Sequence, residues 1–197
     1  IGIDINCGAV TLDSNRITNI YISNSDYSGF VGMYIKGSTV AMITNNDFGT
    51  GSSGQPDNSK IIQVAGGGAG GGMYPGYIYG IWNTSSTSSS TTYNKNNFYY
   101  LFQSGAYTGG NVQCIAHQTN GAAVITNNVI NGPQGAGIGW NQFGIRIEPA
   151  SSIIRSGYIV EGNSIAGPYI NNLGVDAGVT NYGIIIRPNG GNISGSI

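Results

Sequence analysis

The stretch Gly144-Ile145-Arg146-Ile147-Glu148, followed by Tyr158-Ile159-Val160-Glu161-Gly162-Asn163-Ser164-Ile165, decides the fold. It has the pattern of two strands with alternating apolar residues, and it ends in an Asn-x-Ile corner. Related phrases recur along the chain at Gly2-Ile3-Asp4-Ile5, Gly32-Met33-Tyr34-Ile35, Gly80-Ile81-Trp82 and Gly183-Ile184-Ile185-Ile186. The phrase is therefore a repeating unit.

Asparagine marks the corner of each repeat, and successive corners are 31, 51, 31, 35 and 29 residues apart. A repeat near thirty residues that contains strands predicts a solenoid, in which each coil buries its apolar face by stacking on the next. Asparagine suits a corner because it tolerates the left-handed conformation and its amide can bond to the amide of the next coil. The predicted corner residues are Asn15, Asn46, Asn97, Asn128, Asn163 and Asn192.

The composition favours strands over helices. Charged residues make up 8% of the chain, glycine accounts for 34 of 197 residues, and there are only three leucines and two glutamates. Such a chain lacks the best helix formers and is rich in turn residues. The chain has 40% apolar residues and a net charge of −1, whereas disordered chains combine low hydrophobicity with high net charge, so we expect it to fold.

The same numbers exclude several classes of partner. Seven basic residues in a chain of net charge −1 give no basic surface for nucleic acid. No apolar run approaches the ~18 residues that cross a bilayer, so we expect no membrane insertion. The chain starts at Ile1 and ends within a repeat, whereas a solenoid needs capping units. We therefore expect a fragment of a longer protein.

The predicted fold is all-β, a single domain over residues 1–197 forming a right-handed, single-stranded parallel β-helix of about five to seven coils. We expect insertions near residues 49–79, 84–92, 103–111 and 131–142, where glycine, serine and threonine accumulate. A strand is expected at Ile61-Ile62-Gln63-Val64, within the first insertion. The residues expected inside are Ile3, Ile5, Ile35, Ile145, Ile147, Ile184 and Ile186.

The Gly-Ile-x-Ile and Ile-Thr-Asn-Asn-x-Ile phrases, near a thirty-residue period, resemble the right-handed parallel β-helix of the pectate-lyase type. That family includes pectin-degrading lyases and hydrolases, epimerases, phage tailspikes and bacterial surface proteins, so the resemblance implies a fold more than a function. The Asn-Thr-Asp and Gly-Asp-Asp patterns of polygalacturonases do not occur here. This departure makes the common plant-polymer enzymes a weaker interpretation.

Aligning the Gly-Ile strands gives two outward columns, and these are the predicted carbohydrate-binding surface. One reads Asp4, Tyr34, Trp82, Arg146, Ile185, and the other reads Asn6, Lys36, Thr84, Glu148, Arg187. Aromatic faces suit stacking on sugar rings, and charged neighbours would select uronic or amino sugars. The predicted binding residues are Tyr34, Trp82, Arg146, Lys36, Glu148, Arg187 and, on a glycine-rich excursion, Trp140.

Catalytic residues are harder to predict. Glu148, Glu161 and Asp13 are weak candidates, because glycoside hydrolysis needs two carboxylates ~5–9.5 Å apart and these lie on different strands or rungs. His117, the only histidine, is expected to be exposed, because alternation along the strand places it on the face opposite Cys114 and Ala116. Cys7 and Cys114 are expected to be buried free thiols. No cofactor or metal site is expected.

The favoured function is a phage tailspike or tail-fibre segment that binds host surface polysaccharide, as a homotrimer, in an extracellular or virion-surface location. Two alternatives stay open. One is a secreted polysaccharide lyase or glycoside hydrolase, which requires converging carboxylates. The other is a passive bacterial surface or adhesin rod.

Overall fold

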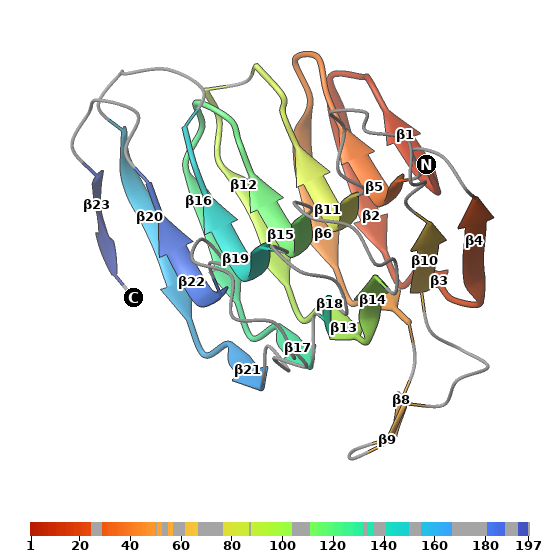
Figure 1. Ribbon diagram of the computed structural model, residues 1–197. Helices are drawn as coiled ribbons and strands as arrows, with labels where there is room; N and C mark the ends of the chain where they lie inside the picture. The colour runs from red at the N-terminus through yellow and green to blue at the C-terminus, as the bar shows by residue number, and fades with distance from the viewer. Residues whose placement is uncertain are drawn as a thin grey trace, which may run out of the picture.

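A computed structural model describes residues 1–24, 29–49, 51–52, 55–56, 62–66, 77–86, 88–103, 111–131, 134–135, 141–149, 155–166, 181–187 and 193–196. These residues form strands, turns and bends, with no helix among them. The strands stack in parallel sheets along one axis, and the two termini lie at opposite ends of the stack (Figure 1). The predicted all-β parallel solenoid is confirmed.

Sheet A contains the Gly-Ile strands of the sequence repeat. Its six strands pair in parallel in the order in which the coils follow each other. It consists of β1 (Ile3–Ile5), β5 (Gly29–Ile35), β11 (Tyr77–Asn83), β15 (Asn111–His117), β19 (Asn141–Ile147) and β22 (Asn181–Ile186).

Sheet B follows sheet A in each coil and also has six parallel strands. It consists of β2 (Ala9–Asp13), β6 (Val40–Thr44), β12 (Thr91–Asn94), β16 (Ala123–Thr126), β20 (Arg155–Glu161) and β23 (Ile193–Ser196).

Two smaller sheets complete the coil. Sheet C has five short strands, and sheet D has four. Sheet C consists of β3 (Arg16–Ile17), β7 (Asp47–Phe48), β13 (Asn97–Tyr99), β17 (Val129–Asn131) and β21 (Ser164–Ala166). Sheet D consists of β4 (Ile20–Asn24), β10 (Ile62–Gly66), β14 (Leu101–Gln103) and β18 (Gln134–Gly135).

Among the described residues, four coils have a strand in every sheet, since sheet D has four strands. This is fewer than the five to seven coils expected, although two further coils contribute strands to some of the sheets. The predicted strand at residues 61–64 is present as β10, which pairs with β4 and β14 and buries Ile62. A short antiparallel hairpin, β8 (Gly51–Ser52) and β9 (Gln55–Pro56), extends from the second coil (Figure 1).

The core is a column of apolar side chains that point inward from all four sheets. Ile35, Ile145 and Ile147 are completely buried, as predicted. Ile3, Ile5, Ile184 and Ile186 also face the core but are only partly buried, because they lie in the terminal coils and are covered from one side.

An asparagine ladder runs along the corner between sheets B and C. In each of its first four members, the backbone N–H and the side-chain Nδ2 both donate to the Oδ1 of the next asparagine, at 2.8–3.1 Å. From the second member onward, Nδ2 also donates to a carbonyl oxygen of a neighbouring strand, at 2.8–3.0 Å. Both hydrogens of those side-chain amides therefore have acceptors. The members are Asn15, Asn46, Asn96, Asn128 and Asn163.

The predicted corner at Asn97 is wrong by one residue. Asn96 is in the ladder, and Asn97 instead donates from Nδ2 to Asp47 Oδ1 at 2.9 Å. The shift arises because Tyr93, not an isoleucine, pairs with Ile43 and takes the buried inward position. The predicted corner at Asn192 lies outside the described residues.

The left-handed conformation also belongs to a different residue than predicted. It is adopted by the residue before each ladder asparagine, with φ between 55° and 63°. This backbone turn directs the asparagine inward, where its amide reaches the next coil. The residues in this position are Ser14, Asn45, Lys95, Asn127 and Gly162.

Candidate functional site

The outward face of sheet A has one rung more than the sequence alignment gave it. Trp82 pairs with Ala116, and Ala116 pairs with Arg146, so β15 lies between the two predicted neighbours. In the second column, the backbone N–H groups of Gln118 and Glu148 bond to Asn83 and His117, which places Gln118 one rung before Glu148. Ala116 and Gln118 are thus site residues that the sequence analysis missed.

The extra rung was missed because Cys114 stands where other rungs have glycine. At Gly80, an added Cβ would lie 2.5 Å from the Phe98 ring, so that rung needs glycine. In the next coil, Ile130 pairs with Phe98 and has a smaller side chain. The smaller isoleucine leaves room for the Cys114 side chain, which is buried. The sequence marker of this rung is therefore Cys114 together with Ile130, in place of the Gly80 and Phe98 of the preceding rung.

The aromatic residues of this face stack on each other. The Tyr34 and Trp82 ring centroids are 4.9 Å apart, and those of Tyr79 and Trp82 are 4.7 Å apart, with interplanar angles of 24° and 13°. Each of these stacks occupies a ring face that the sequence analysis assigned to sugar. Tyr77 is tilted against Tyr79 and Trp82 and is 40% exposed, which makes it the most accessible ring of the cluster. We call Tyr34, Tyr77, Tyr79 and Trp82 the aromatic cluster.

A row of polar side chains runs beside the aromatic cluster. Trp82 Nε1 donates to Gln118 Oε1 at 2.6 Å, and Gln118 Nε2 donates to Glu148 Oε2 at 3.2 Å. Arg146 forms an ion pair with the same Glu148 oxygen. The guanidinium also lies over the Phe143 ring, 5.3 Å from its centroid. The row holds each side chain in a defined orientation, as a preformed binding surface requires.

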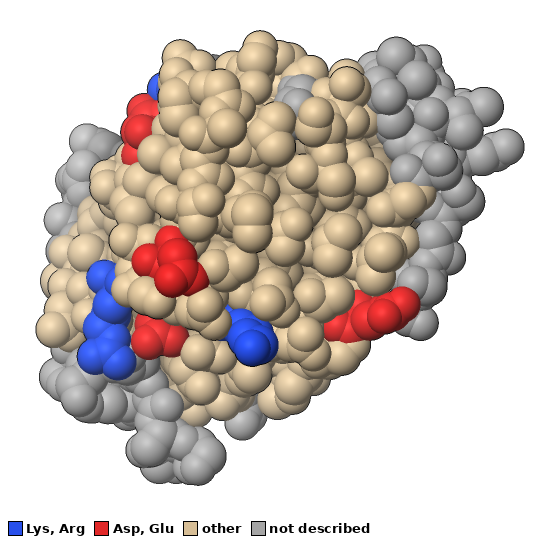
Figure 2. Space-filling view, turned by 180° about the vertical axis from the view of Figure 1, so that it is seen from behind, with Lys and Arg blue, Asp and Glu red and all other residues tan. Residues whose placement is uncertain are grey.

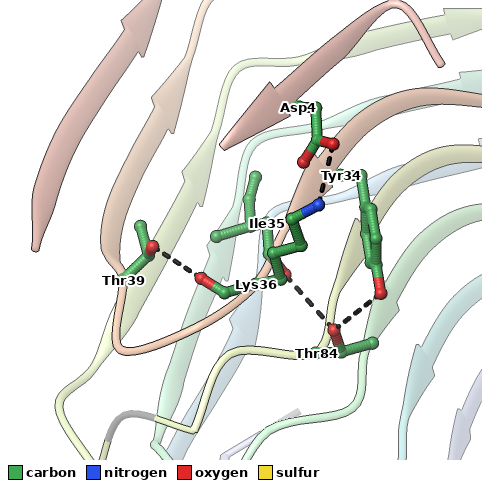
Figure 3. A network of polar contacts seen from close by, with 6 residues as sticks. All are labelled: Asp4, Tyr34, Ile35, Lys36, Thr39 and Thr84. Carbon is green, nitrogen blue, oxygen red and sulfur yellow. Dashed lines mark hydrogen bonds and ion pairs between the residues drawn. The ribbon is translucent and has the colours of Figure 1, made fainter. Parts of the chain in front are cut away.

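Lys36 and Tyr34 form the N-terminal end of this surface (Figure 3). Lys36 Nζ is 2.8 Å from Asp4 Oδ2 and 5.3 Å from the Tyr34 ring centroid. Thr84 Oγ1 donates to Tyr34 Oη at 3.4 Å. The structure therefore brings Tyr34, Lys36 and Trp82 together, as the sequence predicted.

Arg187 and Trp140 are placed differently from the rest. The backbone N–H of Arg187 bonds to Ile147, one rung beyond Glu148, and the Arg187 side chain is exposed. The two are therefore on neighbouring rungs, as expected, but the ion pair of Glu148 is with Arg146. Trp140 lies outside the described residues.

The candidate catalytic carboxylates do not converge. Glu148 follows β19 in sheet A, whereas Glu161 ends β20 in sheet B. Asp13 shares the outward column of Glu161 but is four strand spacings away, or about 19 Å. Hydrogen bonds from Thr44, Asn45 and Ser14 lower the pKa of Asp13, which favours its charged form. These three carboxylates therefore form no acid–base pair.

The prediction of an exposed His117 is wrong. Its side chain is completely buried, because it takes the inward position that Ile35 and Ile147 occupy in other rungs. Nδ1 lies 2.8 Å from Tyr93 Oη, and Nε2 lies 3.0 Å from the Gly121 carbonyl oxygen. A carbonyl only accepts, so Nε2 carries the proton of a neutral ring. Burial lowers the pKa of His117 to about 4 against the opposing effect of the Gly121 bond.

The predictions for the two cysteines differ in outcome. Both are free thiols, and Cys114 is buried as predicted. Cys7 is exposed, contrary to the prediction, because it lies in a bend after β1 at the end of the stack. Within the described ranges, no group of three or more His, Cys, Asp or Glu side chains is placed to hold a metal ion. The described part of the chain also contains no helix that could span a membrane.

Comparisons with protein-family models, curated proteins and solved structures found no match to this chain.

Proposed function

We propose that this chain binds polysaccharide along the outward face of sheet A, as a segment of the tailspike or tail-fibre type. The observation that supports this proposal is the aromatic cluster with its adjoining polar row. Aromatic rings with polar tips, next to amides and carboxylates, form the combination that recognises the apolar faces and hydroxyl groups of sugars.

The shape of the surface also suits a linear polymer. Adjacent strands of sheet A are ~4.8 Å apart, so side chains of one kind recur along the axis at a spacing comparable to that of sugar residues. Tyr182, 43% exposed and stacked on Phe143, lies in the outward column that contains Tyr79. An extended glycan could therefore contact Tyr77 on the third strand of sheet A and Tyr182 on the sixth.

Tyr77→Ala is the direct test, and Tyr21→Ala is its matched control. Tyr21 is an exposed tyrosine, 66% accessible, on β4 of sheet D. Glycan-array binding and affinity electrophoresis in polysaccharide-containing gels would measure both variants, with melting temperatures as the check on folding. We expect Tyr77→Ala to weaken binding roughly tenfold, which is typical for a truncated aromatic contact, and Tyr21→Ala to leave it unchanged. Equal effects of the two substitutions would count against this face.

The placement in a trimeric tail protein at the virion surface is part of the proposal and is motivated by the resemblance of the repeat. Sedimentation equilibrium of the purified chain measures the oligomeric state. The lyase or hydrolase alternative has less support, because Glu148, Glu161 and Asp13 lie apart. Release of reducing or unsaturated ends from a bound polysaccharide would revive that alternative.

A further inference from the structure

Four charged side chains on the outward face of sheet A are paired within the chain, whereas Arg187, on the last rung, is exposed. Lys36 is bonded to Asp4, and Arg146 is bonded to Glu148. Each pair has a net charge of zero, so these four residues give the surface no excess charge of either sign. Figure 2 shows the opposite side of the molecule, the back of the view in Figure 1, and most of that surface is neutral as well.

The Arg146–Glu148 pair is the harder of the two to open. The Arg146 side chain is only 16% exposed, and its guanidinium covers the Phe143 ring. Gln118 donates to the same carboxylate. A uronic-acid carboxylate would have to displace Glu148 from Arg146 and would leave Glu148 partly buried without its partner. Both changes are unfavourable.

Two polar atoms near this pair have unused hydrogen-bonding capacity. Gln113 Oε1 and Arg146 Nε are buried and have no hydrogen-bond partner. Gln113 is paired with Phe143, whose ring Arg146 covers, so the two buried atoms belong to neighbouring strands of sheet A. One is an acceptor and the other is a donor, and a hydroxyl group can serve both.

We infer that the ligand of this face is an uncharged, hydroxyl-rich saccharide, and not the uronic or amino sugar that the sequence pattern suggested. This inference rests on the proposed function. The two ion pairs, Lys36 with Asp4 and Arg146 with Glu148, give no net attraction for an ionic polymer, whereas amides, a tyrosine hydroxyl and unpartnered polar atoms favour hydroxyl groups.

The test compares one polymer in two charge states. Polygalacturonate and its carboxyl-reduced, neutral form have the same linkages, and a panel of neutral and amino-sugar polysaccharides completes the set. We expect neutral polymers to bind at least tenfold more tightly than acidic or cationic ones. We also expect less than a twofold change in affinity between low and high salt, because no ion pair forms. Tighter binding of a charged polymer would overturn the inference but leave the proposed function standing. Failure of every polymer to bind would overturn both.

A pair of variants locates the effect. Glu148→Gln leaves Arg146 without its anionic partner, and Glu161→Gln removes an exposed carboxylate on sheet B. We expect Glu148→Gln to increase binding of polygalacturonate at least fivefold and to make it salt-sensitive, with no such gain for Glu161→Gln. If both variants behave like the parent chain, the Arg146–Glu148 pair does not set the preference and the inference fails.

Discussion

Two buried polar arrays hold the interior of this solenoid, and they differ in how often they occur. The asparagine ladder repeats at every described corner from Asn15 to Asn163. The second array, which we call the histidine network, links Asn83, Tyr93 and His117 within the core and occurs once among the described residues. Both satisfy buried polar groups, as stability requires. The comparison teaches that the structural role of a buried polar residue can be predicted from the sequence when the residue recurs in every repeat, and not when it occurs once.

The largest effect should come from breaking the ladder at its centre. Asn96→Ala leaves the backbone N–H of Asn46 and the carbonyl oxygen of Ile43 without their partners. We expect a loss of roughly 3–5 kcal/mol in the free energy of unfolding, since several buried groups lose their bonds at once. Chemical denaturation measures it. Asn97→Ala, the adjacent control, removes one bond to Asp47 and should cost about 1 kcal/mol or less. Similar losses would refute the assignment of the ladder to Asn96.

A decrease in pH should lower the free energy of unfolding through the histidine network and not through the ladder. The folded protein holds His117 neutral with a pKa of about 4, whereas the unfolded chain protonates near 6.5. The unfolded state therefore binds the extra proton first, and stability falls as pH decreases from 6.5 to 4, by about 3 kcal/mol in total. Denaturation curves across this range measure the slope. His117→Gln should remove this dependence on pH, and a slope retained in that variant would contradict the account.

A smaller loss is expected when the histidine network loses one hydroxyl. Tyr93→Phe keeps the ring in the core but removes the oxygen that accepts from Asn83 Nδ2 and lies 2.8 Å from His117 Nδ1. We expect a destabilisation of roughly 1–3 kcal/mol, because a buried donor and a buried acceptor lose a shared partner. Thermal or chemical unfolding would show it. If Tyr93→Phe leaves the free energy of unfolding unchanged, a water molecule takes the place of the hydroxyl, and the predicted loss is wrong.

The smallest expected effect is an increase in the free energy of unfolding when a residue at the ladder corner is replaced. Lys95 is exposed and has a φ of 55°, where lysine is disfavoured. Asn45 and Asn127 occupy the same position in neighbouring coils. Lys95→Asn should therefore raise the free energy of unfolding by about 0.5–1 kcal/mol. Lys95→Ala serves as a control that removes the charge but does not relieve the backbone, and an equal gain there would point to charge instead.

The parallel solenoid could be predicted because its rules act on every coil. Alternation and the thirty-residue period placed Ile35, Ile145 and Ile147 inside. The same rules failed where a coil substitutes one residue for another. Tyr93 at an isoleucine position moved the predicted ladder residue from Asn96 to Asn97. His117 at another isoleucine position was assigned to the surface.

The candidate site could be predicted only in part. Tyr34, Trp82 and Lys36 were placed together because they lie in or directly after strands with the Gly-Ile phrase or its Gly-Met variant. Gln118 was missed because its strand has Cys114 in place of glycine. The pairing of Arg146 with Glu148 depends on side-chain geometry, which the repeat does not encode. That pairing is the basis of our inference that the ligand is uncharged.

The central claim is that a continuous ladder of buried asparagine amides runs through the stack, and side-chain amide exchange measured by NMR tests it most directly. After transfer to deuterated water, we predict that the Nδ2 hydrogens of Asn46, Asn96 and Asn128 persist, because both are bonded and buried. Those of Asn97, which is half-buried, should exchange much sooner. Rapid loss of the signals of Asn46, Asn96 and Asn128 would contradict the ladder and, with it, this account of the fold.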